Sequence, residues 1–428
     1  MIVIGGGFAG CEAAWQLAKR EIPVTLYEMK PHRYSPAHSM DSLCEVVCSN
    51  SFKSDDITTA SGLLKAEMRL FDSIVLKAAE QTRVPAGGAL AVDREKFSQK
   101  MTELMEQNPY ITIVREEIKA LPEEPVIIAT GPLTSDALAD FLAPILGEKS
   151  LSFYDAAAPV VTAESIDMQI AFCAARYGKG EADYINCPMN REQYTAFYEA
   201  LISAETASLH ENIDKPQVFE GCMPIEIMAK RGERTLSFGP LRPVGLHHPE
   251  TGERFHAVVQ LRRDNTEGTL YNLVGFQTNL KWGEQKRVFS MIPGLENAEF
   301  VRYGVMHRNT YIHSPKLLDR NLALKSDPRI MFAGQMTGVE GYMESAACGI
   351  MAGYLYGRDI CLPPQETMMG ALMRYITGDC VGDFQPMNAN FGILPALEMR
   401  IRNKKERYGV LADRAIEKMK AYKNQTEQ

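Results

Sequence analysis

Short apolar runs and helical periodicities alternate in the first third of the chain. The run 2–4 predicts a strand, residues 11–20 a helix and residues 23–27 a second strand. Two later apolar runs, 111–114 and 126–129, predict further strands. Alternating strands and helices are typical of an α/β fold with a doubly wound parallel sheet of the Rossmann type.

Two helices are expected between the second and third of these strands. Residues 58–80 place apolar side chains at helical spacing, which predicts one continuous helix. The glycine- and proline-containing stretch 84–90 excludes a regular helix. Asp93 is the expected N-cap of a second helix that runs to about Gln107.

The middle of the chain differs in character and has no second glycine-rich fingerprint. The elements expected there are strands at 158–161, 257–261 and 270–277 and helices at 191–204 and 284–291. We therefore predict an inserted α/β domain at 153–319 that binds no second dinucleotide by the usual device. Residues 1–152 and 320–428 are expected to form one discontinuous domain around it.

A glycine-rich fingerprint follows the first strand directly. Gly5, Gly6, Gly7, Phe8, Ala9 and Gly10 spell G-x-G-x-x-G, and Glu28 stands at the end of the second strand. The glycines permit a tight turn, the approach of a pyrophosphate and close packing of the helix, and the acid can bind a ribose. A glycine-rich turn without a ligand is the alternative, but the strand–turn–helix–strand–acid order favours a dinucleotide site.

The last third of the chain returns to this pattern. Residues 330–333 predict a buried strand, Gly334 and Gln335 follow it, and a glycine-containing loop leads into a helix expected at 343–356. In FAD enzymes such a late unit covers the pyrophosphate and points a helix N-terminus at the flavin. An ordinary strand–helix unit is the alternative. Together with the first fingerprint, the late unit favours FAD over NAD.

Composition indicates an ordinary globular protein of 428 residues, 45% hydrophobic and 23% charged. No apolar run reaches the ~18 residues of a membrane helix, and the chain begins in a strand rather than a leader, so we expect a cytoplasmic protein. The nine cysteines form no dense framework, which favours reduced thiols. Cys44 and Cys48 lack a second pair at zinc spacing, so no metal site is expected.

The charge is uneven along the chain. A net charge of −8 argues against nonspecific binding of nucleic acid by the whole surface. Two segments are nevertheless basic: residues 399–423 carry nine Lys/Arg against three acids, and Lys230, Arg231, Arg234 and Arg242 form a second cluster. Each cluster fits either a polyanion site or an ordinary solvated face.

Two cysteines stand out by their neighbours. Cys48 lies in the polar stretch 45–51 and Cys222 lies between Gly221 and Met223, and a thiolate in such a loop can be activated by N–H groups or a cation. Each is equally well explained as a small buried hydrophobe, and a redox dithiol pair is a further alternative. The cysteines expected to be buried and inert are Cys11, Cys173, Cys187, Cys348, Cys361 and Cys380.

Other side chains with chemical potential leave two interpretations open. His307 and Arg308 fit either an anion site or pairing with local carboxylates. Tyr271, Phe276 and Trp282 are expected in the core rather than as platforms on which bases stack.

Long blocks along nearly the whole chain resemble the folate- and FAD-dependent tRNA (uracil-54-C5)-methyltransferases of bacteria. The matching segments include GGGFAGCEAAWQLAKR, VVCSNSF, VPAGGALAVDR, FEGCMPIEIMAKRG, LYNLVGFQTNLKWGEQKRV, FAGQMTGVEGYMESAACG and FQPMNANFG, from Gly5 to Gly392. Two departures are the near absence of residues before the first strand and the additional Cys44. The resemblance implies a glutathione-reductase-like FAD domain with an insertion.

The resemblance also implies a reaction. The family transfers a methylene from 5,10-methylenetetrahydrofolate to C5 of uridine 54 in the tRNA T-loop, with electrons from FAD that NAD(P)H reduces. A thiolate adds to C6 of the uracil, C5 attacks the methylene, and a base removes the C5 proton. The family's two functional cysteines correspond by motif to Cys48 and Cys222, without a division into nucleophile and base. The two basic clusters are the candidates for phosphate contact.

Three other functions are distinguishable. The sister flavoprotein of tRNA wobble-uridine modification is longer and lacks the blocks around Cys48 and Cys222. A small-molecule FAD-dependent oxidoreductase would need no basic C-terminal segment. A non-catalytic tRNA-binding flavoprotein would bind tRNA without forming a methylated product. The oligomeric state is not indicated by the sequence.

Overall fold

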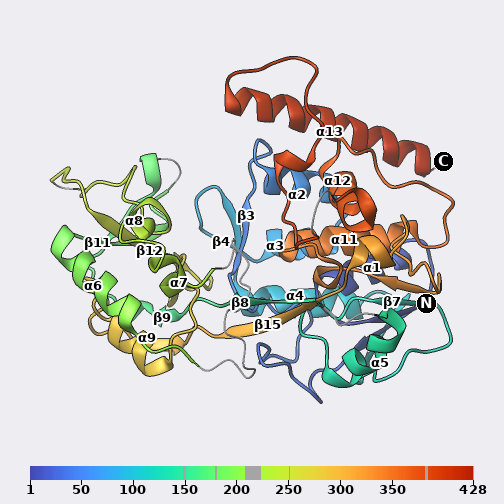
Figure 1. The fold of residues 1–428 in the computed structure, drawn as a ribbon, viewed down its shortest axis with the longest axis horizontal. Coiled ribbons are helices and arrows are strands. Elements are labelled where there is room, and N and C mark those ends of the chain that lie inside the picture. Colours follow the sequence, from blue (N-terminus) through green and yellow to red (C-terminus); the bar gives the residue numbers. More distant parts are fainter. Residues whose placement is uncertain (148–150, 179–180, 208–222, 250, 381–383, 428) are drawn as a thin grey trace.

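The computed structural model describes residues 1–147, 151–178, 181–207, 223–249, 251–380 and 384–427. Two lobes lie side by side, joined by a narrow pair of strands (Figure 1). Segments from both ends of the sequence build the first lobe, and the middle of the sequence builds the second.

A five-stranded parallel sheet forms the centre of the first lobe, in the order β16–β7–β1–β2–β6. Its strands are β1 (Ile2–Ile4), β2 (Val24–Glu28), β6 (Ile111–Arg115), β7 (Val126–Ile128) and β16 (Ile330–Phe332). The late strand therefore joins the sheet that the N-terminal strands begin. This order confirms the predicted Rossmann-type sheet.

Helices cover both faces of this sheet. α1 (Phe8–Ala18) and α11 (Tyr342–Leu355) pack together on one face, and α5 (Asp136–Leu146) covers the other. α11 can approach α1 closely because residue 349 is a glycine: a Cβ there would lie 2.1 Å from the Ala9 carbonyl oxygen. Only a helix with small residues on this face can pack at that distance.

Between β2 and β6 the chain adds helices and a small antiparallel sheet. The elements are β3 (Ser51–Ser54), α2 (Ala60–Leu70), α3 (Ile74–Gln81), β4 (Arg83–Val84), β5 (Ala89–Val92) and α4 (Arg94–Glu106). The single helix predicted at 58–80 is wrong. It breaks at Asp72, which has φ 61°, and Ser73 caps the new helix by accepting from the Leu76 N–H at 3.2 Å. Asp93 caps α4 as predicted.

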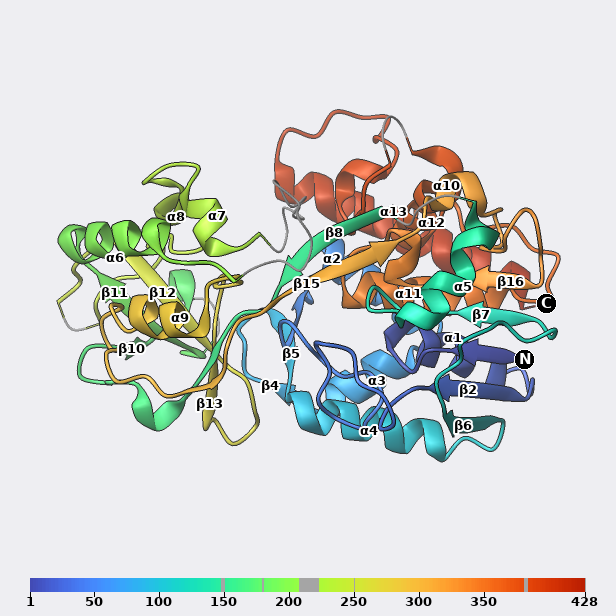
Figure 2. The ribbon, with the colours of Figure 1, turned by 60° about the horizontal axis from the view of Figure 1, so that its bottom comes forward.

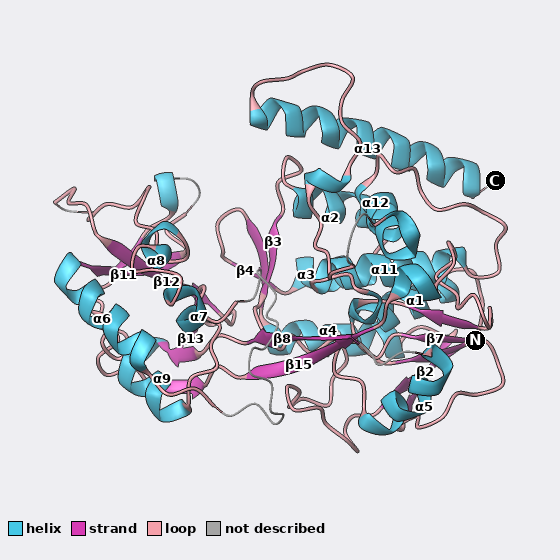
Figure 3. Ribbon diagram, in the orientation of Figure 1, coloured by secondary structure: helices cyan, strands magenta, loops and turns pink. Residues whose placement is uncertain are grey.

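Short and long helices complete the first lobe after β16. They are α12 (Met368–Arg374) and α13 (Lys404–Thr426). A further short helix of the same lobe, α10 (Ser314–Leu317), comes before β16 in the sequence. α13 runs along the outside of the lobe, as the helix colouring shows (Figure 3). It packs there through Leu411, Ala415 and Met419, which are buried, and leaves its other side in solvent.

The second lobe is built on a six-stranded antiparallel sheet in the order β10–β11–β12–β13–β9–β14. The strands are β9 (Val160–Thr162), β10 (Phe172–Cys173), β11 (Tyr184–Met189), β12 (Ala257–Arg263), β13 (Leu270–Leu273) and β14 (Phe300–Arg302). The helices are α6 (Arg191–Ser203), α7 (Ile225–Ala229), α8 (Thr235–Phe238) and α9 (Trp282–Phe289) (Figure 2). The strand predicted at 270–277 ends early because Gly275 has φ 79°.

The two lobes are connected by an antiparallel ribbon, β8 (Leu151–Ala156) and β15 (Met306–Tyr311). The second lobe has its own hydrophobic core, which includes Phe197, Phe276 and Phe289. We propose that this ribbon is the junction of the two domains. The domain boundaries at residues 153 and 319 remain a prediction.

Candidate active site

The turn between β1 and α1 restricts its three fingerprint glycines in different ways. Gly5 has φ 106°, and a Cβ on it would lie 2.5 Å from the Ala129 carbonyl oxygen. A Cβ on Gly10 would lie 1.8 Å from the Gly5 carbonyl oxygen. Gly7 has no such neighbour within 4 Å, and the space beside it is open to a ligand. The turn is therefore held by two glycines and left accessible by the third.

Glu28, the last residue of β2, is buried beside this turn. Its Oε2 accepts a hydrogen bond from the Gly6 N–H at 2.9 Å, and its Oε1 accepts one from the Lys30 N–H at 3.0 Å. Each carboxylate oxygen has further acceptor capacity, so the group can also accept from a ribose hydroxyl.

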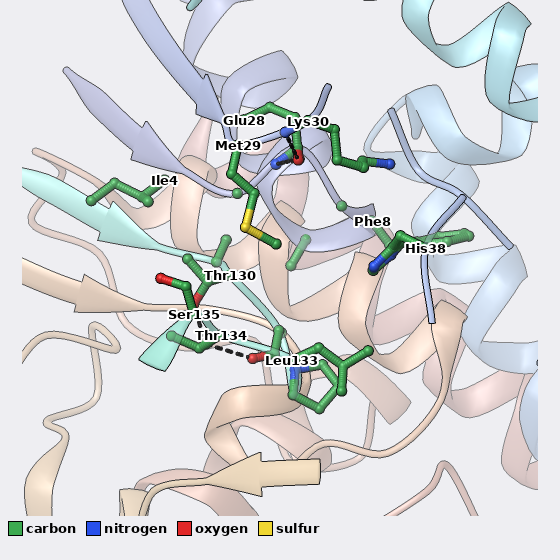
Figure 4. Close-up of a pocket in the computed structure, with 18 of the residues that line it drawn as sticks. Ile4, Phe8, Glu28, Met29, Lys30, His38, Thr130, Leu133, Thr134 and Ser135 are labelled. Carbon is green, nitrogen blue, oxygen red and sulfur yellow. Dashed lines mark hydrogen bonds between the residues drawn. The ribbon is translucent and has the colours of Figure 1, made fainter. Parts of the chain in front are cut away.

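A cavity opens at the carboxyl ends of the parallel strands, where ligands of doubly wound sheets bind. The predicted cofactor residues that line it are Gly5, Gly6, Gly7, Phe8, Ala9, Glu28, Gly334 and Gln335. Gly10 lies beneath the turn and supports it. Glu28 and Lys30 lie on one side of the cavity, across from Leu133 and Thr134 (Figure 4).

The late strand–helix unit supplies a wall of the cavity beside the glycine turn. Gly334 has φ 81°, and a Cβ on it would lie 2.6 Å from the Ala9 Cβ. Gln335 Nε2 donates to Glu340 at 2.7 Å. A glycine turn at a helix N-terminus, a fixed carboxylate and a second glycine contact from a distant strand are the parts that a bound FAD requires. The residues present therefore fit FAD.

Sequence reasoning missed a polar cluster in the same cavity. Lys30 Nζ lies 3.4 Å from Glu45 Oε2, and both side chains are buried. Burial, with the nearby charge of Lys30, lowers the pKa of His38. These residues come from an irregular segment, so no hydrophobic period or motif marks them in the sequence.

Cys48 reaches the cavity through a tyrosine. Its N–H donates to the Tyr342 Oη at 2.9 Å, and its Sγ lies 3.1 Å from the same oxygen. Tyr342 lines the cavity and stacks on Phe8, with ring centres 4.7 Å apart. Burial and the neighbouring Cys48 raise the pKa of Tyr342 well above its usual value, so the phenol is protonated. The Tyr342 hydroxyl is therefore available as a donor to a thiolate.

Three buried or half-buried arginines hold the loop that carries Cys48. Arg94 donates to the Val46 carbonyl at 2.6 Å and to the Cys48 carbonyl at 2.9 Å, and it pairs with Asp264 at 2.8 Å. Arg262 donates to the side chains of Ser49 and Asn50, at 2.8 and 2.9 Å. Asp264 and Arg262 belong to the second lobe. Both lobes therefore position this loop, in a cationic setting that favours a thiolate.

Arg302, also from the second lobe, lies 3.5 Å from the Val47 carbonyl oxygen. Sequence reasoning missed all three arginines. Arg94 and Asp264 are 170 residues apart in the sequence, so no local pattern of residues reveals that they form a pair.

The other predicted cysteines have three different outcomes. Cys222 lies outside the described residues. Cys11, Cys187 and Cys348 are buried, as predicted. The same prediction is wrong for three others: Cys173 on the two-residue edge strand β10 and Cys361 in a loop are exposed, and Cys380 is half-buried. Short edge strands and loops leave one side of the chain in solvent.

The remaining candidates are placed as follows. Tyr271 and Phe276 are buried, as predicted, but Trp282 is 61% exposed, so its assignment to the core is wrong. It stands at the first position of α9, beyond the packed face of that helix, and stacks on Tyr303 at 5.5 Å. The side chains of His307 and Arg308 lie outside the described part.

Within the described ranges, no three His, Cys, Asp or Glu side chains gather closely enough to hold a metal ion. None of the described helices combines the length and the apolar character that crossing a membrane requires.

Comparison with known proteins places this geometry in a family. Residues 1–360 match the family described as Glucose inhibited division protein A. The methylenetetrahydrofolate–tRNA-(uracil-5-)-methyltransferase TrmFO of Acetivibrio thermocellus is 58% identical over 426 residues, 98% of each chain. The chain belongs to this methyltransferase family. The enzyme of the same name from Listeria monocytogenes serotype 4b is 56% identical over 98% of this chain and 97% of its own.

A solved structure shares the fold. GidA of Aquifex aeolicus, in its form II crystal, superposes with a TM-score of 0.69 at 17% identity, over 98% of this chain and 73% of that chain. The methyltransferase family thus keeps the GidA architecture at low sequence identity.

Proposed function

We infer that the chain transfers the one-carbon unit of 5,10-methylenetetrahydrofolate to C5 of a uracil in tRNA, namely uridine 54 of the T-loop. Its relatives at 56–58% identity carry the name of this reaction. Bound FAD, reduced by NAD(P)H, supplies the electrons that turn the methylene into a methyl group. Because the substrate is tRNA, we assign the activity to the cytoplasm.

The contact between Cys48 and Tyr342 carries the assignment of the site. It joins the candidate thiol to a residue that lines the dinucleotide cavity. C5 of uracil is a poor nucleophile until a thiolate adds to C6, so the thiol must stand beside the redox cofactor. We propose Cys48 and Cys222 as the two catalytic residues, one the nucleophile and the other the base, and leave their roles undivided.

The other residues near Cys48 have positioning roles in this proposal. The Cys48 thiol donates to the Tyr342 Oη, and once the thiol ionises the Tyr342 hydroxyl can donate a hydrogen bond to the thiolate. Arg94 fixes the loop by holding two of its carbonyl groups. Extruding the target uracil from the T-loop costs a few kcal/mol, and a loop anchored in this way keeps the thiol in place while that happens.

The test uses purified holoenzyme, unmodified tRNA transcript, labelled methylenetetrahydrofolate and NADPH. We expect a yellow protein that labels position 54, and a loss of labelling by about 10³-fold or more with Cys48→Ala or Cys222→Ala. Cys173→Ala changes an exposed thiol of the second lobe and serves as the matched control. A yellow protein that oxidises NADPH without labelling tRNA would contradict the proposal and favour a small-molecule oxidoreductase.

A further inference from the structure

Basic residues gather on two exposed surfaces of this acidic chain, one on each lobe. In both ribbon views the beginning of α13 points toward the second lobe, and α7 and α8 lie on the same side of the molecule (Figures 1 and 2). We propose that the two surfaces bind the tRNA substrate together: one takes the phosphate backbone of a stem, the other the unpaired loop. This inference rests on the proposed function and adds where its substrate docks.

The lysine surface lies at the beginning of α13. It comprises Arg400, Arg402, Lys404, Lys405 and Arg407, all exposed. One acid, Glu406, lies among these five cations, and a second, Glu398, precedes them in the sequence. None of the five forms an ion pair with any residue in the described ranges. Cations without acidic partners attract phosphates and release their counterions on binding, which is a contact without base specificity.

The arginine–aromatic surface lies on the second lobe and comprises Tyr177, Arg234, Phe238, Arg242 and Val244. Phe238 is 70% exposed and Tyr177 58%. The Arg234 guanidinium lies 5.3 Å from the centre of the Phe238 ring, and Arg242 donates to the Tyr177 Oη at 3.2 Å. Large exposed rings beside guanidinium groups are what unpaired bases stack on, and a stem offers no free base faces to them.

Hydrogen bonds from the half-buried Arg176 keep the arginine–aromatic surface in place. Arg176 donates to the carbonyl groups of Arg242 at 2.6 Å and Val244 at 2.9 Å, and to the Gln260 side chain at 2.9 Å. Burial, and then the charge of Arg242, lower the pKa of Arg176. Two guanidinium groups are thus held close together without a carboxylate partner among the described residues, an arrangement that an anion would stabilise.

The active-site loop lies at the contact of the two lobes, because Cys48 is held by Arg94 of the first and its neighbours by Arg262 of the second. An RNA that contacts both surfaces therefore spans the region in which this loop lies. The second half of α13 runs away from the second lobe (Figure 1), so Lys418 and Lys420 fall outside the lysine surface.

The experiment measures the affinity of the holoenzyme for two RNAs over a series of KCl concentrations. One RNA is the T-arm stem–loop, and the other is a blunt duplex with the same stem. The variants are Lys404→Gln/Lys405→Gln/Arg407→Gln on the lysine surface and Phe238→Ala on the second lobe. Lys418→Gln/Lys420→Gln is the matched control on the same helix, and Phe238→Trp is the conservative variant that keeps an exposed ring.

We expect the lysine-surface variant to weaken both RNAs and to lower the slope of log K against log[salt] by roughly two to three. Phe238→Ala should weaken stem–loop binding by about tenfold, with a slope change below about one and little effect on the duplex. Phe238→Trp and the control should stay within about twofold of wild type.

The proposal is overturned if the control variant weakens binding as much as the lysine-surface variant, or if Phe238→Ala affects duplex and stem–loop alike. An unchanged salt slope in the lysine-surface variant would also overturn it. Wild-type protein that binds the stem–loop but never methylates it would instead contradict the proposed function and leave the docking surfaces standing.

Discussion

At the scale of single residues, the glycine turn separates folding from ligand binding. A Cβ on Gly10 would lie 1.8 Å from the Gly5 carbonyl oxygen, so the fold itself requires a glycine at this position. Gly7 has ordinary backbone angles, φ −85° and ψ −171°, and an open space where a Cβ would point. The fold tolerates a side chain there, and only a ligand in the cavity would meet it.

We therefore expect Gly7→Ala to fold normally but to bind FAD more weakly, by about 1–3 kcal/mol of crowding. The matched control is Gly88→Ala, since Gly88 also has no neighbour within 4 Å but lies in the turn between β4 and β5. Flavin content after gel filtration and the thermal midpoint of the flavin-free protein measure the two effects. Equal flavin affinity in Gly7→Ala and wild type would show that no ligand approaches this turn.

At the scale of elements, one buried cation ties α2 to β3. Lys65 Nζ donates to the Phe52 carbonyl at 2.8 Å and to the Ser61 carbonyl at 2.9 Å. Burial lowers the pKa of Lys65 to about 8. The unfolded chain holds this proton up to about pH 10.4, so between pH 8 and that value unfolding takes up a proton and stability rises with pH.

Lys65→Met should remove this rise. From pH 7.5 to pH 10, we expect the unfolding free energy of the wild type to rise by up to about 3 kcal/mol relative to that of the variant. Urea unfolding of both proteins at the two pH values measures it. Parallel pH profiles of the two proteins would mean that the ammonium is as well solvated in the folded state as in the unfolded one.

The elements differ in how far the sequence predicts them, for physical reasons. β7 and β16 are buried along their whole length, so short apolar runs such as 126–129 are enough to reveal them. The break at Asp72 is not visible in the periodicity of 58–80, because a serine cap and a single positive φ decide it. Trp282 precedes the helix predicted at 284–291 and stands at the first position of α9, and its aromatic character alone does not fix its burial.

At the scale of the whole molecule, the two lobes meet at a buried ion pair between Arg94 and Asp264. The glycine turn could be predicted because all its parts lie within 28 residues of sequence. This ion pair could not, since its partners are brought together only when the inserted lobe packs against α4. The same holds for the setting of Cys48, whose motif was predictable but whose supporting arginines were not.

Asp264→Asn should leave Arg94 as an uncompensated buried charge, at a cost of about 3–5 kcal/mol. We expect a large fall in tRNA methylation at saturating tRNA, because Arg94 without its partner no longer holds the loop of Cys48 in place. The glycine turn of the cavity does not depend on this ion pair, so the flavin content should be retained. The matched control is Glu267→Gln, which removes the exposed partner of Lys96 in the same interface and should cost below about 1 kcal/mol. Equal methylation rates in both variants would exclude the positioning role of Arg94.

The pairing of β16 with β7 also dictates the order in which the sheet can be completed during synthesis. β7 ends at Ile128 and β16 begins at Ile330, so one edge of β7 has no strand to pair with until the whole inserted lobe has been translated. At about 5–20 residues per second this takes on the order of 10–40 s. For that interval the nascent chain carries an open apolar sheet edge, which is a template for aggregation, beside an inserted lobe that already contains all of its own core.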